Sequence, residues 1–193
     1  MSKICFGEGD ALYERYHDEE WGRPVKDERG LYEKLCLEAF QSGLAWITIL
    51  RKRAAFRSAF RDFDPEVVAR FGKRDTNRLL NDAGIVRNRL KVEAAIANAK
   101  ATLALRDGPR SLEQVIWDHA PAPRRKTPRT WADVPALTAE STALSKELKR
   151  HGFRFVGPTT AYALMQACGL VNDHLAGCRV RAAVERERTA LTA

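Results

Sequence analysis

Residues 31–50, with the sequence LYEKLCLEAFQSGLAWITIL, are almost entirely apolar, yet they hold a carboxylate in their middle, Glu38. On a helix, which turns about 100° per residue, Glu38 falls on one stripe with Leu31 and Leu35. The pattern therefore predicts that Glu38 points into the protein. An unpaired buried charge is costly, so Glu38 is either a structural carboxylate paired inside the core or a carboxylate that faces a pocket.

Elsewhere, the spacing of apolar residues and the positions of capping and helix-breaking residues predict short helices. No alternating apolar and polar pattern extends beyond a few residues. The sequence therefore predicts an all-α protein. The expected helices lie over residues 10–17 with Asp10 as N-cap, from the N-cap Asp27 to about Gln41, from Leu44 or Ala45 to Phe60, from Asp64 and Pro65 onward, from the N-cap Asp75 to Gly84, over 87–105, from Ser111 to Trp117, over 141–151 and over 158–168.

Three segments carry more specific structural expectations. In the alanine-rich helix over 87–105, the buried stripe is predicted to include Leu90. Residues 120–135, which contain four prolines and several basic residues, are expected to form an exposed loop. Residues 1–178 are predicted to form one helical domain, and 179–193 a charged C-terminal tail that frays.

The charge of the chain indicates a polyanionic partner. The net charge is +8, from 33 Lys and Arg against 25 Asp and Glu. Basic residues cluster at 51–57, 87–91, 124–129 and 146–154, each beside a predicted helix end or loop. That distribution is typical of several short phosphate contacts, as in nucleic-acid binding. The alternative is a generically basic protein without such a partner.

The chain shows no signal for a membrane or for export. No run of about 18 apolar residues occurs, and the N-terminus lacks the apolar core of a signal peptide. A cytoplasmic location without membrane contact is therefore expected. In that compartment the four cysteines are expected to be thiols or metal ligands rather than disulfides.

Two Cys and two His lie near the two ends of the chain. Cys5 and His17 are close to the start, and His174 and Cys178 are close to the end with an i, i+4 spacing. On one helix, that spacing would let both residues bind the same tetrahedral metal, and the four together would complete a structural zinc site without an open position. The alternative is ordinary buried cysteines and a surface histidine.

The chain from Leu144 reads LSKELKRHGFRFVGPTTAYALMQACGL, a basic helix followed by a glycine turn and an apolar helix that opens at Thr159. This arrangement resembles a helix-hairpin-helix, in which free backbone N–H groups at a helix N-terminus bind a DNA phosphate. Gly157 lies in that turn, and Lys149 and Arg154 could add positive charge. The alternative is an ordinary pair of antiparallel helices with a glycine cap.

Four aromatic residues lie near Glu38 in sequence: Tyr13, Tyr16, Trp21 and Trp46. Aromatic walls around a buried carboxylate could hold a flat cationic ring by stacking and by charge. The alternative is that they are core aromatics.

Taken together, five blocks of the sequence closely resemble the bacterial 3-methyladenine DNA glycosylase I family, in collinear order over about residues 5–178. The resemblance implies an all-helical member of the helix-hairpin-helix glycosylase superfamily that excises 3-methyladenine from alkylated DNA. The blocks are YHDEEWGRPVKDE at 16–28, LYEKLCLEAFQSGLAWITIL at 31–50, DAGIVRNRLK at 82–91, LSKELKRHGFRFVGPTT at 144–160 and MQACGLVNDH at 165–174.

The resemblance also implies roles for individual residues. Glu38 and Tyr16 match residues that hydrogen-bond the base, and Trp46 matches one that stacks on it. Gly43 and Leu44 match residues that approach the gap left by the flipped nucleotide. The family's zinc ligands match the four residues described above: Cys5, His17, His174 and Cys178.

The sequence departs from the family's pattern beside the first cysteine. The family often carries a Trp two residues after that cysteine, whereas this chain reads Cys5-Phe6-Gly7. Phe6 is a candidate for the missing wall, which would require a different backbone path. The shape of the pocket mouth is therefore left open.

These expectations combine into a monomeric glycosylase that acts on double-stranded DNA containing alkylated adenine, with Glu38 as the central site residue. No lysine lies in the apolar stretches where its pKa would fall, so a monofunctional enzyme without strand cleavage is expected. Two other classes of function remain: a zinc-stapled module that binds damaged DNA without chemistry, and a hydrolase of free modified nucleosides. The positive charge argues against the second, because a nucleoside needs no phosphate track.

Overall fold

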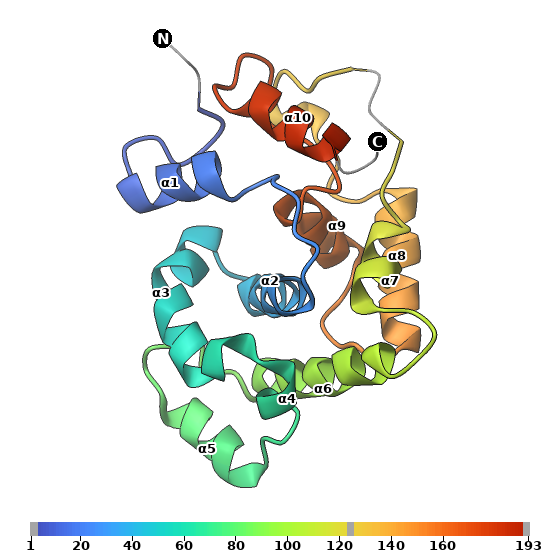
Figure 1. The fold of residues 1–193 in the computed structure, drawn as a ribbon. Coiled ribbons are helices and arrows are strands. Elements are labelled where there is room, and N and C mark those ends of the chain that lie inside the picture. The colour runs from blue at the N-terminus through green and yellow to red at the C-terminus, as the bar shows by residue number, and fades with distance from the viewer. Residues whose placement is uncertain (1–3, 123–125, 191–193) are drawn as a thin grey trace.

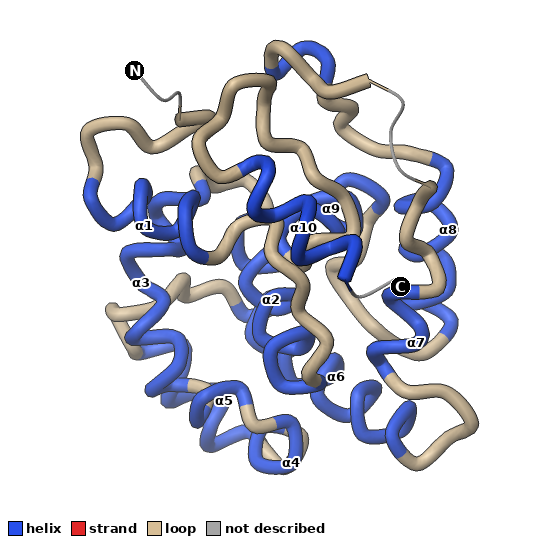
Figure 2. The backbone as a smooth tube through the Cα atoms, turned by 45° about the horizontal axis from the view of Figure 1, so that its top comes forward, coloured by secondary structure: helices blue, strands red, loops and turns tan. Residues whose placement is uncertain are grey.

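The computed structural model describes residues 4–122 and 126–190, and this part of the chain is helical without a β-sheet (Figures 1 and 2). The all-α prediction is confirmed, and most helices lie close to their expected bounds. The α-helices are α1 (Ala11–Glu19), α2 (Glu28–Gln41), α3 (Trp46–Ala59), α4 (Pro65–Val68), α5 (Lys73–Asn81), α6 (Arg89–Arg106), α7 (Leu112–Trp117), α8 (Ala139–Arg150), α9 (Pro158–Ala167) and α10 (Arg181–Ala190), with 3-10 turns η1 (Arg61–Phe63) and η2 (Trp131–Asp133).

Helix α2 runs through the middle of the molecule and is seen end-on in Figure 1. It contacts α3, α6, α7 and α9 as well as η1. Its N-cap is Asp27, whose carboxylate accepts a hydrogen bond from the Gly30 N–H at 2.7 Å. Because neighbours surround it, α2 buries residues on nearly every side, which explains why its sequence is apolar on most faces. Glu38 is among the buried residues, as the stripe predicted.

Several N-caps are the residues that the sequence indicated. The side chains of Asp10, Asp64 and Ser111 each accept hydrogen bonds from backbone N–H groups at the start of α1, α4 and α7. The prediction for α5 was wrong, because Gly72 and not Asp75 is its N-cap. Asp75 lies inside the first turn, where its carboxylate reaches back to the Gly72 N–H at 3.1 Å. A carboxylate three residues into a helix can satisfy this otherwise free donor.

The first turn of α6 differs from its predicted stripe. Leu90 is 65% exposed, whereas Lys91 is buried. The Lys91 ammonium donates hydrogen bonds to the backbone oxygens of Phe40 at 2.9 Å and Ser42 at 2.5 Å. The end of α2 thus lies against the start of α6, and its carbonyls require a donor there. That requirement places Lys91 inward and leaves Leu90 in solvent.

The expectation that the C-terminal tail frays is also wrong. Residues 181–190 form α10, which buries Val184. The Arg188 guanidinium donates hydrogen bonds to the backbone oxygens of Gly169 at 2.6 Å and Leu170 at 2.7 Å. Figure 1 shows α10 at the same end of the molecule as α1. The tail therefore packs onto the segment that follows α9.

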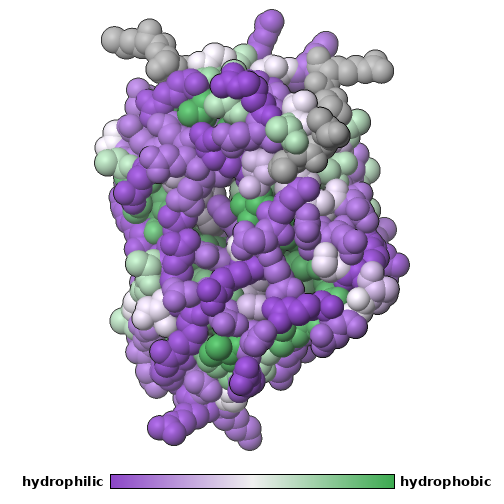
Figure 3. All heavy atoms as spheres, viewed as in Figure 1, coloured by the Kyte–Doolittle hydropathy of each residue, from purple (hydrophilic) through white to green (hydrophobic). Residues whose placement is uncertain are grey.

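The face of the molecule in Figure 3 is largely hydrophilic, with small apolar patches between charged side chains. None of the described helices combines the length and the apolar character needed to cross a bilayer.

Candidate functional site

A cavity of about 330 Å³ opens beside α2, and the Glu38 side chain faces it. All four aromatic residues that the sequence singled out line this cavity, so they and Glu38 meet in one place. The remaining wall comes from residues that the sequence analysis did not assign to a pocket, Phe6 excepted. The lining residues are Phe6, Tyr13, Tyr16, Trp21, Glu38, Gln41, Trp46, Trp131, Ala163 and Gln166.

Glu38 is a buried carboxylate without a protein partner in the described part of the chain. It is 5% exposed, and neither a hydrogen bond nor an ion pair joins its carboxylate to any described residue. Burial raises its pKa to about 7, against a smaller lowering effect of the Lys34 ammonium. The reading of Glu38 as a structural carboxylate paired in the core is therefore not supported, and a ligand in the cavity would meet an unsatisfied acceptor.

The aromatic rings form a continuous wall around Glu38. The ring centroids of Tyr16 and Trp46 are 5.3 Å apart, and those of Phe6 and Trp21 are 5.1 Å apart. The Trp46 indole nitrogen is buried and has no hydrogen-bond partner among the described residues. The pocket therefore combines aromatic faces with a carboxylate acceptor.

Phe6 enters the pocket because its neighbour cannot carry a side chain. Gly7 has a φ of +84°, and a Cβ added there would lie 2.9 Å from the Cβ of Tyr13. A Trp at position 7 would therefore collide with α1 on this backbone path. Phe6 instead lines the cavity and contacts the Tyr13 ring at 4.9 Å between centroids.

The position of Trp131 in the pocket was not predicted from the sequence. It belongs to η2, within the segment predicted to be an exposed loop, and its ring lines the cavity beside Phe6 and Trp21. The described residues of that segment are mostly exposed, but the Trp131 side chain reaches the pocket. The only signal in the sequence was a lone Trp in a proline-rich loop, which says nothing about where the loop folds back. The basic residues at 124 and 125 lie outside the described residues.

The four candidate metal ligands meet at one point, although they come from opposite ends of the chain. Their ligand atoms all lie within 4.8 Å of one another. The Cys178 sulfur lies 3.4 Å from both the His17 Nε2 and the His174 Nδ1, and the Cys5 sulfur lies 3.7 Å from the latter. Tetrahedral zinc with ordinary bond lengths separates its sulfur and nitrogen ligands by about 3.6 Å. The four residues therefore fit a zinc ion.

The surroundings of these residues also suit a metal. His17 directs its other nitrogen to the Asp18 carboxylate at 2.8 Å, and His174 directs its own to the Trp21 backbone oxygen at 3.1 Å. Such acceptors orient a metal-binding histidine. Contact with Cys5 and hydrogen bonds from the two histidines hold the pKa of the Cys178 thiol well below its ordinary range.

One geometric premise of the metal prediction was wrong. His174 and Cys178 lie in the irregular segment between α9 and α10, not on one helix. They converge because the chain turns there. Gly22 approaches this segment closely, with a φ of +80°, and a Cβ added there would lie 3.2 Å from the His174 Nε2.

The cluster of four candidate metal ligands lies directly behind the pocket wall. The Phe6 and His17 rings are 4.9 Å apart, and the Trp21 and His174 rings are 4.7 Å apart, both edge to face. The position of the aromatic wall is therefore tied to the position of the cluster.

A second groove, of about 500 Å³, runs from Glu38 along the turn after α2 to the start of α9. It brings together three of the predicted DNA-binding residues, Gly43, Leu44 and Thr159. Leu44 is 40% exposed. Gly157 is the N-cap of α9 but does not line the groove.

The basic clusters have unequal roles. In the cluster at 51–57, the three arginines pair with carboxylates of the N-cap of α1, of the turn after α1 and of α2, so the prediction of a phosphate contact there is not supported. These pairs are Arg51 with Asp10, Arg53 with Glu20 and Arg57 with Glu33. In the cluster at 146–154, Lys149 and Arg154 are exposed and form no ion pair with any described residue. Exposed charge without an ion pair to a described residue therefore remains beside the hairpin between α8 and α9, and also at Arg87 in the cluster at 87–91.

One premise about lysines was wrong. Burial lowers the pKa of Lys91, so a lysine in a desolvated environment does exist near the pocket. Its ammonium is bound to the backbone oxygens of Phe40 and Ser42, on either side of the pocket residue Gln41.

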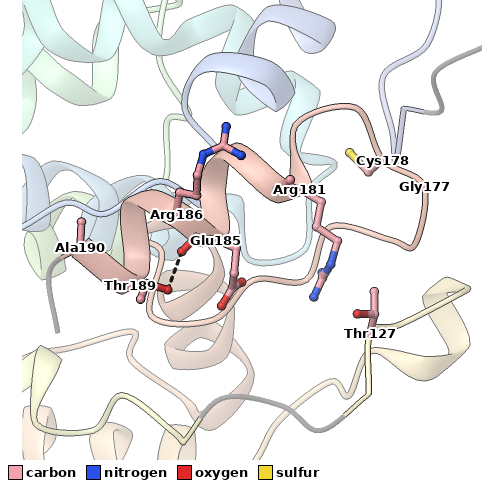
Figure 4. A pocket seen from close by; sticks show the side chains of 9 residues that line it. Thr127, Gly177, Cys178, Arg181, Glu185, Arg186, Thr189 and Ala190 are labelled. Carbon is pink, nitrogen blue, oxygen red and sulfur yellow. Dashed lines mark hydrogen bonds between the residues drawn. The ribbon is translucent and has the colours of Figure 1, made fainter. Parts of the chain in front are cut away.

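A separate hollow of about 840 Å³ lies beside α10 (Figure 4). Several of its polar groups are engaged in the fold. The Arg181 guanidinium donates to the backbone oxygens of Asn172 and His174, and the Thr189 hydroxyl donates to the Glu185 backbone oxygen, drawn as a dashed line. No buried side-chain atom recorded without a partner among the described residues lines this hollow, in contrast to the pocket at Glu38.

Comparison with known proteins gives a consistent picture. A family model described as methyladenine glycosylase matches residues 6–182. DNA-3-methyladenine glycosylase 1 of Escherichia coli is 47% identical over 181 residues, which cover 92% of this chain and 96% of that relative. A crystal structure of 3-methyladenine DNA glycosylase I matches with a TM-score of 0.88 at 44% identity, covering 92% of this chain and 98% of the other. The Staphylococcus aureus enzyme, studied for its recognition of 3-methyladenine, matches with a TM-score of 0.87 at 36% identity, over 94% and 97% of the two chains.

Proposed function

Since the chain belongs to the methyladenine glycosylase family and is a glycosylase enzyme, we propose that it flips 3-methyladenine out of alkylated double-stranded DNA and excises it by hydrolysis. The observation that carries the proposal is Glu38, a buried carboxylate without a protein partner that faces an aromatic pocket. A cationic purine matches both features, because its edge can donate hydrogen bonds and its faces can stack.

Recognition of the base is the main task of this pocket. Methylation at N3 makes adenine cationic and weakens its glycosidic bond, so the base departs as a neutral group with little need for a general acid. In the proposal, ionised Glu38 accepts a hydrogen bond from the adenine edge, Trp46 stacks on the ring and Tyr16 fixes its orientation. Tyr13 and Trp21 complete the wall. The enzyme contributes mostly by extruding the nucleotide and holding the base.

The same geometry explains selectivity. A purine that presents an acceptor to Glu38 would place two acceptors opposite each other, which costs on the order of 1–3 kcal/mol. Adducts of guanine should therefore be poorer substrates than 3-methyladenine.

We propose that Cys5, His17, His174 and Cys178 hold a structural zinc ion. The donor set, the separations of the ligand atoms and the acceptors behind both histidines support this assignment. Bound there, zinc would join the two ends of the chain through four protein ligands, with no position left for a reacting water.

We further propose that α8 and α9 act as a helix-hairpin-helix on DNA, with the protein working as a monomer. Gly157 and Thr159 lie at the N-terminus of α9, where free N–H groups and the helix dipole favour a phosphate. Lys149 and Arg154 would add charge beside it, while Gly43 and Leu44 would enter the space left by the flipped nucleotide.

The enzyme is expected to be monofunctional, without strand cleavage, although Lys91 is buried. A nucleophilic Lys91 would have to lose its proton and its hydrogen bonds to the Phe40 and Ser42 oxygens, both of which would then lack their donor. Borohydride treatment during turnover should leave no covalent protein–DNA adduct. An adduct that disappears in Lys91→Met would overturn this part of the proposal.

The direct test is release of free base from methylated DNA, with 3-methyladenine and 7-methylguanine separated by chromatography. The wild type should release 3-methyladenine in preference, and Glu38→Gln should lose at least about tenfold in rate. Glu33→Gln, on the wet side of α2, is the matched control and should behave as wild type. Release of neither base by a folded wild type would favour a DNA-binding module without chemistry.

A further inference from the structure

We propose that Trp131 is the outer wall of the base pocket and contacts the flipped base directly. This inference rests on the proposed function. It assigns a substrate-binding role to the segment between α7 and α8, which the sequence predicted to be an exposed loop.

The position of Trp131 is the first argument. Its ring centroid lies 6.2 Å from that of Phe6 and 6.1 Å from that of Trp21, and it lines the same cavity as Glu38. Trp131 is 44% exposed, whereas Glu38 and Tyr16 are buried. The pocket therefore has its polar group in the interior and Trp131 at its rim.

The ring is held in place before any ligand arrives. The Trp131 indole N–H donates a hydrogen bond to the Cys5 backbone oxygen at 3.1 Å. The Asp133 carboxylate accepts hydrogen bonds from the backbone N–H groups of Arg129 at 2.8 Å and Thr130 at 2.9 Å, which closes the turn that carries the ring. A wall that is already ordered loses little conformational entropy when a base binds.

The protein itself gains little from this ring. Trp131 does not belong to the main hydrophobic core, and a large part of its surface stays in solvent. A half-exposed aromatic beside a pocket stabilises a complex chiefly when a flat ligand covers it. Truncation of Trp131 should therefore weaken base binding much more than it weakens the fold.

The experiment measures the dissociation constant of free 3-methyladenine by calorimetry on the full chain. Two variants test the wall: Trp131→Ala removes the ring, and Trp131→Phe keeps a ring but removes the N–H. Their controls are Leu137→Ala, another exposed apolar residue near this segment, and Trp117→Phe, whose indole N–H also donates to a backbone oxygen, that of Val25 at 2.9 Å. Thermal unfolding and zinc content are recorded for each protein.

Trp131→Ala should bind the base about tenfold more weakly than wild type, with an unfolding temperature and zinc content close to those of Leu137→Ala. The dissociation constant of Trp131→Phe for 3-methyladenine should remain within about threefold of that of Trp117→Phe, because an aromatic face is still present. Equal affinity of Trp131→Ala and Leu137→Ala would overturn the inference while leaving the proposed function intact. A loss in Trp131→Phe as large as in Trp131→Ala would also contradict a role for the ring itself.

Failure of the proposed function looks different. In that case the wild type itself would neither bind free 3-methyladenine nor release it from methylated DNA. That result would reject the proposed function and, with it, the role of Trp131.

Discussion

Glu38 is the residue in which burial, charge and function are most closely connected. Its carboxylate is buried among aromatic rings without a described partner, and burial raises its pKa to about 7. A folded protein with such a group is less stable than one without it, because the ionised form is poorly solvated. The buried carboxylate therefore lowers the stability of the folded protein, but it provides an acceptor that is free to bind a ligand.

This cost predicts how stability depends on pH. The pKa of Glu38 is about 7 in the folded chain, and its ordinary value is 4.5. The folded state holds the proton more tightly, so stability is unaffected below about pH 4.5 and falls as the pH rises to about 7. Glu38→Gln cannot ionise, so its free energy of unfolding should match the wild type at pH 4 and exceed it by up to about 3 kcal/mol at pH 8.

Urea unfolding of both proteins at the two pH values measures this difference. Glu33→Gln serves as the control, because Glu33 pairs with Arg57 at the surface of the molecule, and it should not reproduce the gain at pH 8. A difference between wild type and Glu38→Gln that stays constant with pH would mean that the pKa of Glu38 is the same in the folded and the unfolded chain, and would contradict the effect of burial.

At the scale of elements, the turn after α2 depends on α6. Helix α2 has no basic residue in its own last turn, and the Lys91 ammonium from α6 satisfies the carbonyls there instead. A cation at a helix C-terminus is also favoured by the helix dipole. Lys91 therefore holds the turn that presents Gly43 and Leu44.

Lys91→Met should destabilise the protein by about 1–3 kcal/mol, because two backbone oxygens lose their donor. The loss should be local, so hydrogen exchange should accelerate at residues 42–45. Lys52→Met is the matched control, since Lys52 donates to the backbone oxygens of Ala83 at 2.9 Å and Gly84 at 3.2 Å, away from the pocket. Its exchange should accelerate near 83–85 instead. Unchanged exchange at 42–45 in Lys91→Met would contradict the role assigned to Lys91.

At the scale of the whole molecule, the four candidate metal ligands join the two ends of the chain. The Asp18 carboxylate also binds the Arg179 guanidinium, so some contacts between the ends do not involve the cluster. Removal of the proposed zinc ion should therefore loosen this end of the molecule rather than unfold the protein completely.

A chelator should lower the unfolding temperature, and added zinc should restore it, because a metal that binds the folded chain stabilises it by mass action. Cys178→Ser should contain less zinc and should show a lower unfolding temperature before any chelator is added. Cys36→Ala, which changes a buried cysteine outside the cluster, is the control and should retain zinc. Full zinc content in Cys178→Ser would exclude Cys178 as a ligand.

The distribution of unpaired cations predicts where DNA binds. Lys149→Ala and Arg154→Ala should each weaken binding to DNA and reduce the slope of affinity against salt by about 1. Arg57→Ala is the control, because its guanidinium already binds the Glu33 carboxylate at 2.8 Å, and it should leave the slope unchanged. An equal effect of all three would indicate that only the total charge of the protein matters.

Features that depend on neighbouring residues could be predicted from the sequence. Helical spacing placed Glu38 on the inner side of α2, and the side chains of Asp10, Asp64 and Ser111 identified helix starts, because a capping bond joins residues a few positions apart. Motifs with residues of the right chemistry indicated the pocket aromatics and the candidate zinc ligands, together with the family.

Features that depend on contacts between distant segments could be seen only in the folded molecule. The position of Trp131 in the pocket, the burial of Lys91 beneath α2 and the pairing of Arg51, Arg53 and Arg57 with acids of other elements follow from how the helices pack. A local sequence pattern does not predict which carbonyl, carboxylate or cavity a side chain will contact after folding. For the same reason, the tail that was expected to fray became α10, because the segment after α9 offers Arg188 two backbone oxygens.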